Sequence, residues 1–268
     1  MNDRIANLPW YDLPELQPRT DAFWEAVARR LGPTAPAGLL REGQHGDQLR
    51  SDRLLLSQTC GYDVVNGFRS VVRVVATPSY RIEGVTSGSY RSYVVVRKDS
   101  RSRLLEDLRG TRLVINSLCS HSGTNALRAL IAPIARSGHF FASVTATGSH
   151  VASLERIAAG DADTAAIDCV TYGLLKRVRP SLLERTRVVA RTAEAPAPPF
   201  VTRGNASDEE VSELRAALAD AIDDDIRDAL LLDGVEAAEV DRYESIADME
   251  RAARALGYTE LERVLATR

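Results

Sequence analysis

Long apolar segments are absent from this sequence. No apolar run approaches the roughly 20 residues that a helix needs to span a bilayer, so we expect no membrane insertion. The first residues, MNDRIANLPWYDLPEL, contain neither a basic segment nor an apolar one, and no secretory signal is visible. We therefore expect a cytoplasmic protein if this start is the native one, unless a leader has been removed.

Cysteine is also scarce. The three cysteines, Cys60, Cys119 and Cys169, are odd in number and far apart, which predicts free thiols and no disulfide framework. Cys119 and His121 form one isolated pair of metal-ligating residues, without the C-x-x-C partner of a structural zinc site. We expect neither a metal nor a cofactor.

Lysine is scarcer still, with only Lys98 and Lys176, so arginine carries nearly all the positive charge. The 34 basic and 37 acidic residues leave a net charge of −3, whereas a nucleic-acid or membrane-surface partner needs a broad basic face. The 44% hydrophobic and 26% charged fractions are those of an ordinary soluble protein. We expect no nucleic-acid partner.

Helical patterns and short apolar strands alternate along the chain, which predicts an α/β fold with largely parallel sheets. Thr20 is expected to cap the first helix, and Ser207 a later one. The proline-rich segment AEAPAPPFVTRGN favours an extended crossing between two Rossmann-like lobes. The predicted lobes are residues 1–91 with 200–268, and residues 92–199, joined by two crossing strands with a ligand cleft between them.

Three strand-to-helix corners are rich in hydroxyl groups and amide donors. One contains Ser120, His121, Ser122 and Gly123, the second contains Gly148, Ser149 and His150, and the third is SQTCGY, with Gln58 and Thr59. A helix N-terminus carries unsatisfied N–H groups and a partial positive charge, so each corner suits an anion. The plainer interpretation is that Ser122 only caps its helix.

Two further positions complete the predicted site. Asp168 ends a strand at the same edge, where it either holds His150 or acts as an ordinary helix cap. Tyr90 and Ser92 alternate along the first crossing strand, so both can face the cleft. Arginines 69, 73 and 128 are expected to be solvated.

The order of the motifs SQTCGY, GSYRS, SHSGTNALRALIAP, GSHVASL and DADTAAIDCV resembles a known family. It is similar to the phosphate, phosphite and phosphonate substrate-binding proteins of ABC transporters, over about Leu8 to Tyr258. These are periplasmic binding proteins of the type II fold, which close on a tetrahedral oxyanion and perform no chemistry.

The resemblance implies a role for each matching position. Residues 120–122 match the hydroxyl-rich anion loop, with His121 where threonine is common, and His150 matches a ligand-contacting histidine. Tyr90 and Ser92 match the Tyr-x-Ser crossing, while Gln58 and Thr59 match a loop from the other lobe. Asn116-Ser117 stands where Asp-Pro is frequent. The stretch APAPPF at the second crossing has no acidic residue after Glu194 to hold a ligand amine.

These patterns leave three functions open. The first is the non-enzymatic solute-binding component of an ABC-type uptake system, whose ligand is phosphate, phosphite or a small phosphonate and whose partner is the transporter permease. The second is a cytoplasmic ligand sensor with a signalling partner. The third is a type II-fold enzyme that uses His150 and Asp168, although no G-x-S-x-G elbow is present.

Overall fold

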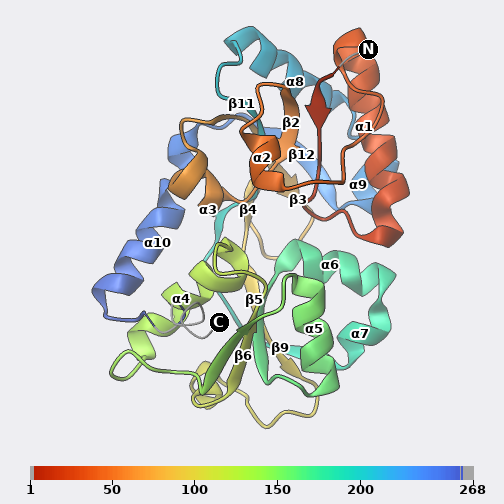
Figure 1. The fold of residues 1–268 in the computed structure, drawn as a ribbon. Coiled ribbons are helices and arrows are strands. Elements are labelled where there is room, and N and C mark those ends of the chain that lie inside the picture. The colour runs from red at the N-terminus through yellow and green to blue at the C-terminus, as the bar shows by residue number, and fades with distance from the viewer. Residues whose placement is uncertain (1–2, 260, 262–268) are drawn as a thin grey trace. The chain divides into compact units, whose positions relative to one another are not determined.

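The computed structural model describes residues 3–259 and 261, and its chain divides into two compact units (Figure 1). Unit 1 contains the residues up to Ser89 together with Pro196–Glu244. Unit 2 contains Tyr90–Ala195 together with the residues from Ser245 onward. The chain therefore passes between the units at residues 89–90, 195–196 and 244–245, which we call the first, second and third crossings.

Unit 1 is built on a five-stranded mixed sheet. Its strand order is β1 (Ile5–Ala6), β2 (Leu54–Gln58), β11 (Phe200–Arg203), β3 (Val72–Tyr80) and β12 (Leu232–Glu236). β1 and β2 are parallel, whereas β11 is antiparallel to both of its neighbours and β12 is antiparallel to β3. All five residues of β2 are buried, which explains its continuous apolar run.

The helices of unit 1 are α1 (Gln17–Leu31), α2 (His45–Leu49), α3 (Gly61–Asp63), α8 (Asp208–Asp220) and α9 (Asp224–Ala229). Short 3-10 helices occupy Pro14–Leu16, Gly32–Thr34 and Val240–Tyr243, and a π-helical turn occupies Val64–Phe68. The predicted cap at Ser207 is present, because its Oγ accepts the Glu210 amide hydrogen of α8 at 3.1 Å. Thr20 is not a cap, since α1 already begins at Gln17 and the Thr20 hydroxyl donates to the Leu16 carbonyl.

Unit 2 has its own five-stranded mixed sheet, in the order β7 (Ser143–Ala146), β6 (Arg112–Ile115), β8 (Thr164–Asp168), β5 (Ser92–Arg97) and β9 (Thr186–Arg191). Its helices are α4 (Ala126–Ile131), α5 (His150–Ala159), α6 (Cys169–Val178), α7 (Pro180–Glu184) and α10 (Glu244–Ala255), the last beginning at the third crossing. Short 3-10 helices occupy Leu105–Leu108 and Ala132–Ile134, and a π-helical turn occupies His121–Asn125. Helix α4 lies on one side of this sheet and α5, α6 and α7 lie on the other (Figure 1).

The sheets are less parallel than the sequence predicted. In unit 2, β6 is parallel to β7 and β8, but β5 is antiparallel to β8 and β9. In each unit an interior strand that is antiparallel to both of its neighbours follows a crossing, β5 after the first and β11 after the second. The short strands β4 (Ser89–Tyr90) and β10 (Ala195–Pro196), which contain these two crossings, pair with each other.

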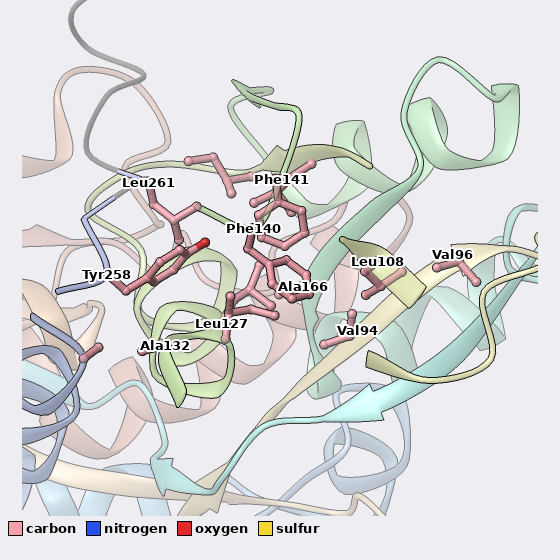
Figure 2. Packing of buried hydrophobic residues seen from close by; sticks show 14 residues of the cluster. Val94, Val96, Leu108, Leu127, Ala132, Phe140, Phe141, Ala166, Tyr258 and Leu261 are labelled. Carbon is pink, nitrogen blue, oxygen red and sulfur yellow. The ribbon is translucent and has the colours of Figure 1, made fainter. Parts of the chain in front are cut away.

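The end of the chain belongs to unit 2, and the predicted boundaries placed it in the other lobe. Ala253, Tyr258 and Leu261 join the hydrophobic core that β5, β6 and α4 form in unit 2 (Figure 2). The predicted segments were 1–91 with 200–268 and 92–199, so the difference is largest beyond residue 244. Ala253, Tyr258 and Leu261 are buried in this core, and their burial favours packing of the segment in unit 2.

Arg128 was predicted to be solvated, and the structure shows that it is buried. Its side chain is 3% exposed and pairs with Glu250 of α10 at 3.0 Å. A buried guanidinium requires a partner of opposite charge, and the sequence did not reveal one 122 positions away. The contact also ties α10 to α4 within unit 2.

Candidate functional site

The first predicted corner forms a compact loop after β6, which we call the anion loop (residues 120–123). Ser120 is the N-cap of the π-helical turn, and its Oγ accepts the amide hydrogen of Gly123 at 3.0 Å. Ser120 Oγ and Ser122 Oγ lie 3.4 Å apart, and both residues are buried. The capping role that the plainer interpretation gave to Ser122 therefore falls to Ser120.

Ser122 instead contacts the second predicted corner. Its Oγ lies 2.8 Å from Nε2 of His150, the first residue of α5. Ser149 caps this helix, because its Oγ accepts the amide hydrogen of Ala152 at 3.0 Å. The fold thus brings together two corners that lie 28 residues apart in the sequence.

Both histidines of the cluster are neutral at pH 7, although His121 is buried and His150 is only partly buried. Burial lowers the pKa of His121 to about 3 and the pKa of His150 to about 4, from an ordinary value near 6.5. The nearby Ala166 backbone opposes the shift at His150 only in part. The cluster therefore offers hydrogen bonds from neutral groups and adds no positive charge of its own.

Tyr90 and Ser92 both contact the anion loop. The Ser92 hydroxyl donates to the Ser122 carbonyl at 2.7 Å, and the Tyr90 ring lies 5.8 Å from the His121 ring. Both residues are buried, at 2% exposure for Tyr90 and 1% for Ser92. Tyr90 and Ser92 therefore support the anion loop on the side where β5 begins.

Asp168 follows the plainer of its two predicted roles. Its Oδ1 accepts the amide hydrogens of Val170 and Thr171 at 2.7 and 3.0 Å, which is the contact pattern of a helix N-cap. It lies opposite Ser92 in the register of β5 and β8. The carboxylate thereby stabilises the start of α6 at the same edge of the sheet.

Gln58 and Thr59 belong to unit 1, where they end β2. The Gln58 amide donates to Tyr80 Oη at 2.9 Å and to the Pro198 carbonyl at 3.0 Å, so both of its hydrogens are used within unit 1. Thr59 is fully buried, and its Oγ1 makes no hydrogen bond with the described residues. Because a buried hydroxyl normally has a partner, Thr59 retains an unused donor.

Sequence reasoning missed two asparagines beside the anion loop. Asn125 donates from Nδ2 to His121 Nδ1 at 3.2 Å, and its position four residues after His121 on one helical face was the available signal. Asn116 directly follows β6, and its Oδ1 is buried without a hydrogen-bond partner among the described residues. A Cβ at Gly123 would overlap this oxygen, so the Asn116 side chain lies directly against the loop.

Neutral donors on a rigid α/β scaffold can hold an anion without reacting with it. Among the nine predicted residues, only Asp168 has an acidic side chain, and its Oδ1 caps α6. Among the described residues, no group of three or more His, Cys, Asp or Glu side chains is placed to hold a metal ion. Within residues 3–259 and 261, no helix has the length and apolar character to cross a membrane.

Two α/β units with mixed sheets, linked by repeated crossings of one chain, define the class of solute-binding proteins with the type II periplasmic binding protein fold. The family model described as "ABC transporter, phosphonate, periplasmic substrate-binding protein" matches residues 5–250. The chain belongs to this family, whose members are substrate-binding components of ABC transporters and are typically periplasmic.

Solved structures share this fold at low sequence identity. The binding-protein component of an ABC phosphonate transporter from Pseudomonas aeruginosa is 18% identical, with a TM-score of 0.75 and 98% of each chain covered. PhnD1 from Prochlorococcus marinus, in complex with methylphosphonate, is 17% identical, with a TM-score of 0.73, covering 89% of this chain and 93% of that one. XAC2383 from Xanthomonas citri, bound to chloride, is 15% identical, with a TM-score of 0.69, covering 95% of this chain and 98% of that one. No curated protein sequence is similar enough to match.

Proposed function

We propose that this protein reversibly binds a small tetrahedral phosphorus oxyanion, namely phosphate, phosphite or a small phosphonate. The observation that carries the proposal is the contact of the anion loop with the start of α5, where Ser122 Oγ and His150 Nε2 lie 2.8 Å apart. Ser120 and His121 adjoin this pair in the same loop. An oxyanion has many acceptor sites and no donors when fully ionised, so a cluster of neutral donors suits it.

The proposal disfavours ligands that carry an amine. The last acidic residue before the second crossing is Glu194. Its carboxylate already forms an ion pair with Arg91 within unit 2. A ligand ammonium group would have to compete with this arginine. We therefore expect methylphosphonate to bind more tightly than 2-aminoethylphosphonate.

A thermal-shift panel at equal ligand concentrations tests the proposal, with phosphate, phosphite, methylphosphonate, 2-aminoethylphosphonate, sulfate and malate. A ligand present at about 100 times its Kd adds roughly 2.7 kcal/mol to the free energy of unfolding. We expect a clear rise in Tm with at least one of the first three ligands. If none of the phosphorus oxyanions raises the Tm, the proposal is wrong.

The proposal extends to Thr59 of unit 1, whose buried hydroxyl has no partner among the described residues. Thr59→Val keeps the shape of the side chain and removes this donor. We expect the affinity for the best ligand of the panel to fall about fivefold to tenfold, as for one lost hydrogen bond. Isothermal titration calorimetry measures the change, and an unaltered Kd would remove Thr59 from the site.

The role in the cell follows from the same binding. We propose that the liganded protein delivers the oxyanion to an ABC transporter permease, as the family membership supports. The alternative is a cytoplasmic sensor that docks on a signalling partner. Fractionation of cells that express the full-length gene separates the two, because a transporter component is exported and a sensor stays in the cytosol.

One contact favours a second candidate function. Ser122 Oγ and His150 Nε2 have the distance of a nucleophile and its general base. In this alternative the protein is an enzyme of the type II fold. The enzyme is supported if the wild type turns over a phosphonate or phosphate ester and His150→Ala loses this turnover but still binds the ligand. Binding without turnover in the wild type supports the first candidate, the binding protein.

A further inference from the structure

A chain of buried polar contacts runs from α10 to the anion loop within unit 2. Glu250 of α10 pairs with Arg128 of α4 at 3.0 Å, and Arg254 also donates to Glu250 at 2.9 Å. Arg128 donates in turn to Asn125 Oδ1 at 3.3 Å. Asn125 then contacts His121 of the anion loop. Of these groups, only His121 and Arg128 had been considered from the sequence, and Arg128 was expected in solvent.

The amide of Asn125 has only one orientation that satisfies its neighbours. Arginine has no acceptor atom, so the oxygen of the amide must face Arg128. The amide nitrogen then donates to the carbonyl of Ile246 at 2.9 Å and lies 3.2 Å from His121 Nδ1. A reversed amide would place two acceptors, its own oxygen and the Ile246 carbonyl, against each other. Arg128 and the Ile246 carbonyl therefore independently orient the amide of Asn125 so that its NH2 group faces His121.

This orientation determines which nitrogen of His121 carries the proton. Burial lowers the pKa of His121 to about 3, so the ring is neutral and has a single N–H at pH 7. A ring nitrogen that accepts a hydrogen from an amide has no proton of its own. Nδ1 is the acceptor here, which leaves the proton on Nε2.

We propose that Asn125, oriented by Arg128 and Glu250, is a positioning residue that holds the proton of His121 on Nε2 and makes this ring a neutral donor of the anion loop. The inference rests on the proposed function, since a donor is useful only to an anionic ligand. In the other tautomer, Nε2 would present a lone pair, which repels an oxyanion. The contacts of Glu250, Arg128 and Asn125 thus select the tautomer of His121 without adding charge to the anion loop.

The experiment uses the full chain labelled with 15N. Long-range 1H–15N correlation spectra of histidine distinguish the two neutral tautomers, and the loss of one signal set in His121→Asn assigns this residue among the four histidines. We expect the wild-type protein without ligand to show the Nε2–H tautomer from pH 6 to 8. An Nδ1–H ring in this spectrum overturns the proposal, whichever variants fold.

Asn125→Leu removes the amide and keeps a side chain of similar size. We expect a mixture of tautomers at His121 and an affinity for methylphosphonate that falls about tenfold, as for one lost hydrogen bond to an anion. Thr124→Val is the matched control. It removes a buried hydrogen bond of the same turn, from Thr124 Oγ1 to the Ser117 carbonyl at 2.6 Å, but does not touch His121.

The outcomes separate the positioning role from the proposed function. If His121 remains purely in the Nε2–H tautomer in Asn125→Leu, then Asn125 does not determine the tautomer, and the proposal is overturned. Equal tautomer mixing in Thr124→Val overturns it too, because any disturbance of the turn would then have the same effect. A wild-type protein that binds neither phosphate nor methylphosphonate contradicts the proposed function, and the His121 spectra then decide the positioning role alone.

Discussion

Ser122 contacts more of the predicted site than any other single side chain described here. Its Oγ lies near both Ser120 and His150, and its carbonyl accepts a hydrogen bond from Ser92. The backbone contact holds the residue, while the hydroxyl remains free to rotate between the histidine and a ligand. Ser122 is therefore the residue on which we expect affinity to depend most.

Ser122→Ala should weaken binding of phosphate and methylphosphonate by about tenfold to a hundredfold, because a hydrogen bond to a charged group is lost. Isothermal titration calorimetry measures the change. Ser207→Ala is the matched control in unit 1, where the serine caps α8. It should lower the free energy of unfolding by about 1 kcal/mol and leave the affinity unchanged. Equal affinities of the Ser122 variant and the wild type would contradict the proposed site.

The buried histidines predict how stability depends on pH. The pKa of His121 is lowered to about 3 and that of His150 to about 4, so between pH 4 and 6.5 the unfolded chain binds more protons than the folded one. The free energy of unfolding should therefore fall as the pH drops through this window, by up to about 2 kcal/mol per histidine at pH 5. Asp63 acts in the opposite direction between pH 6 and 4, because burial raises its pKa to about 6.

Urea unfolding at pH 7.5 and pH 5 measures this dependence. His150→Asn should reduce the difference between the two pH values by about 2 kcal/mol, since one of the neutral buried rings is gone. The exposed His139 provides the control, and His139→Asn should leave the difference unchanged. If the difference in the free energy of unfolding between pH 7.5 and pH 5 is as large in His150→Asn as in the wild type, the His150 ring is not buried in its neutral form.

At the scale of elements, the anion loop depends on a π-helical turn that leaves no room for a side chain at its glycine. A Cβ at Gly123 would overlap Asn116 Oδ1 and come within 3.3 Å of His150 Cε1. Unit 1 contains a turn of the same type over Val64–Phe68, where a Cβ at Gly67 meets nothing within 4 Å. The two glycines therefore occupy similar backbone and very different surroundings.

Gly123→Ala should lower the free energy of unfolding by about 1–3 kcal/mol and abolish most oxyanion binding, because Asn116 and His150 must move. Gly67→Ala should change the stability by less than about 1 kcal/mol, in the stabilising direction, and leave binding intact. Chemical denaturation and calorimetry of both variants measure the two effects. Similar behaviour of the two variants would contradict the packing described for the anion loop.

At the scale of the whole molecule, the third crossing returns the chain to unit 2. Helix α10 begins at Glu244, and its residue Glu250 forms the buried pair with Arg128. Ala253, Tyr258 and Leu261 belong to the hydrophobic core of this unit. The last part of the chain therefore stabilises the unit that contains the anion loop.

Arg128→Met should lower the free energy of unfolding by about 3–5 kcal/mol, because it removes the buried partner of the Glu250 carboxylate and leaves only the half-exposed Arg254 to pair with it. The double variant Arg128→Met, Glu250→Met should recover much of this loss, since neither charge remains to be paired. Urea unfolding of the two variants and of Glu250→Met completes the double-mutant cycle. A coupling energy near zero would show that the two side chains do not interact.

The sequence predicted the local elements well because their signals are local. The apolar runs that became β2 and β5 and the serine cap of α8 lie at or near their predicted positions. The corner residues also fell at helix beginnings, as their hydroxyl groups indicated. The direction of β5 was missed, because strand composition carries no information on whether a neighbour is parallel or antiparallel.

The amino-acid sequence alone determined the α/β class, the family resemblance and the residues of the anion loop, since these depend on residue type and short spacing. Only the tertiary structure decided that α10 packs in unit 2, that Arg128 is buried and that Asn125 directs its amide at His121. These contacts join positions that are far apart in the chain or depend on the orientation of an amide. Burial and hydrogen bonding in the folded chain determine these contacts, and no local sequence pattern indicates them.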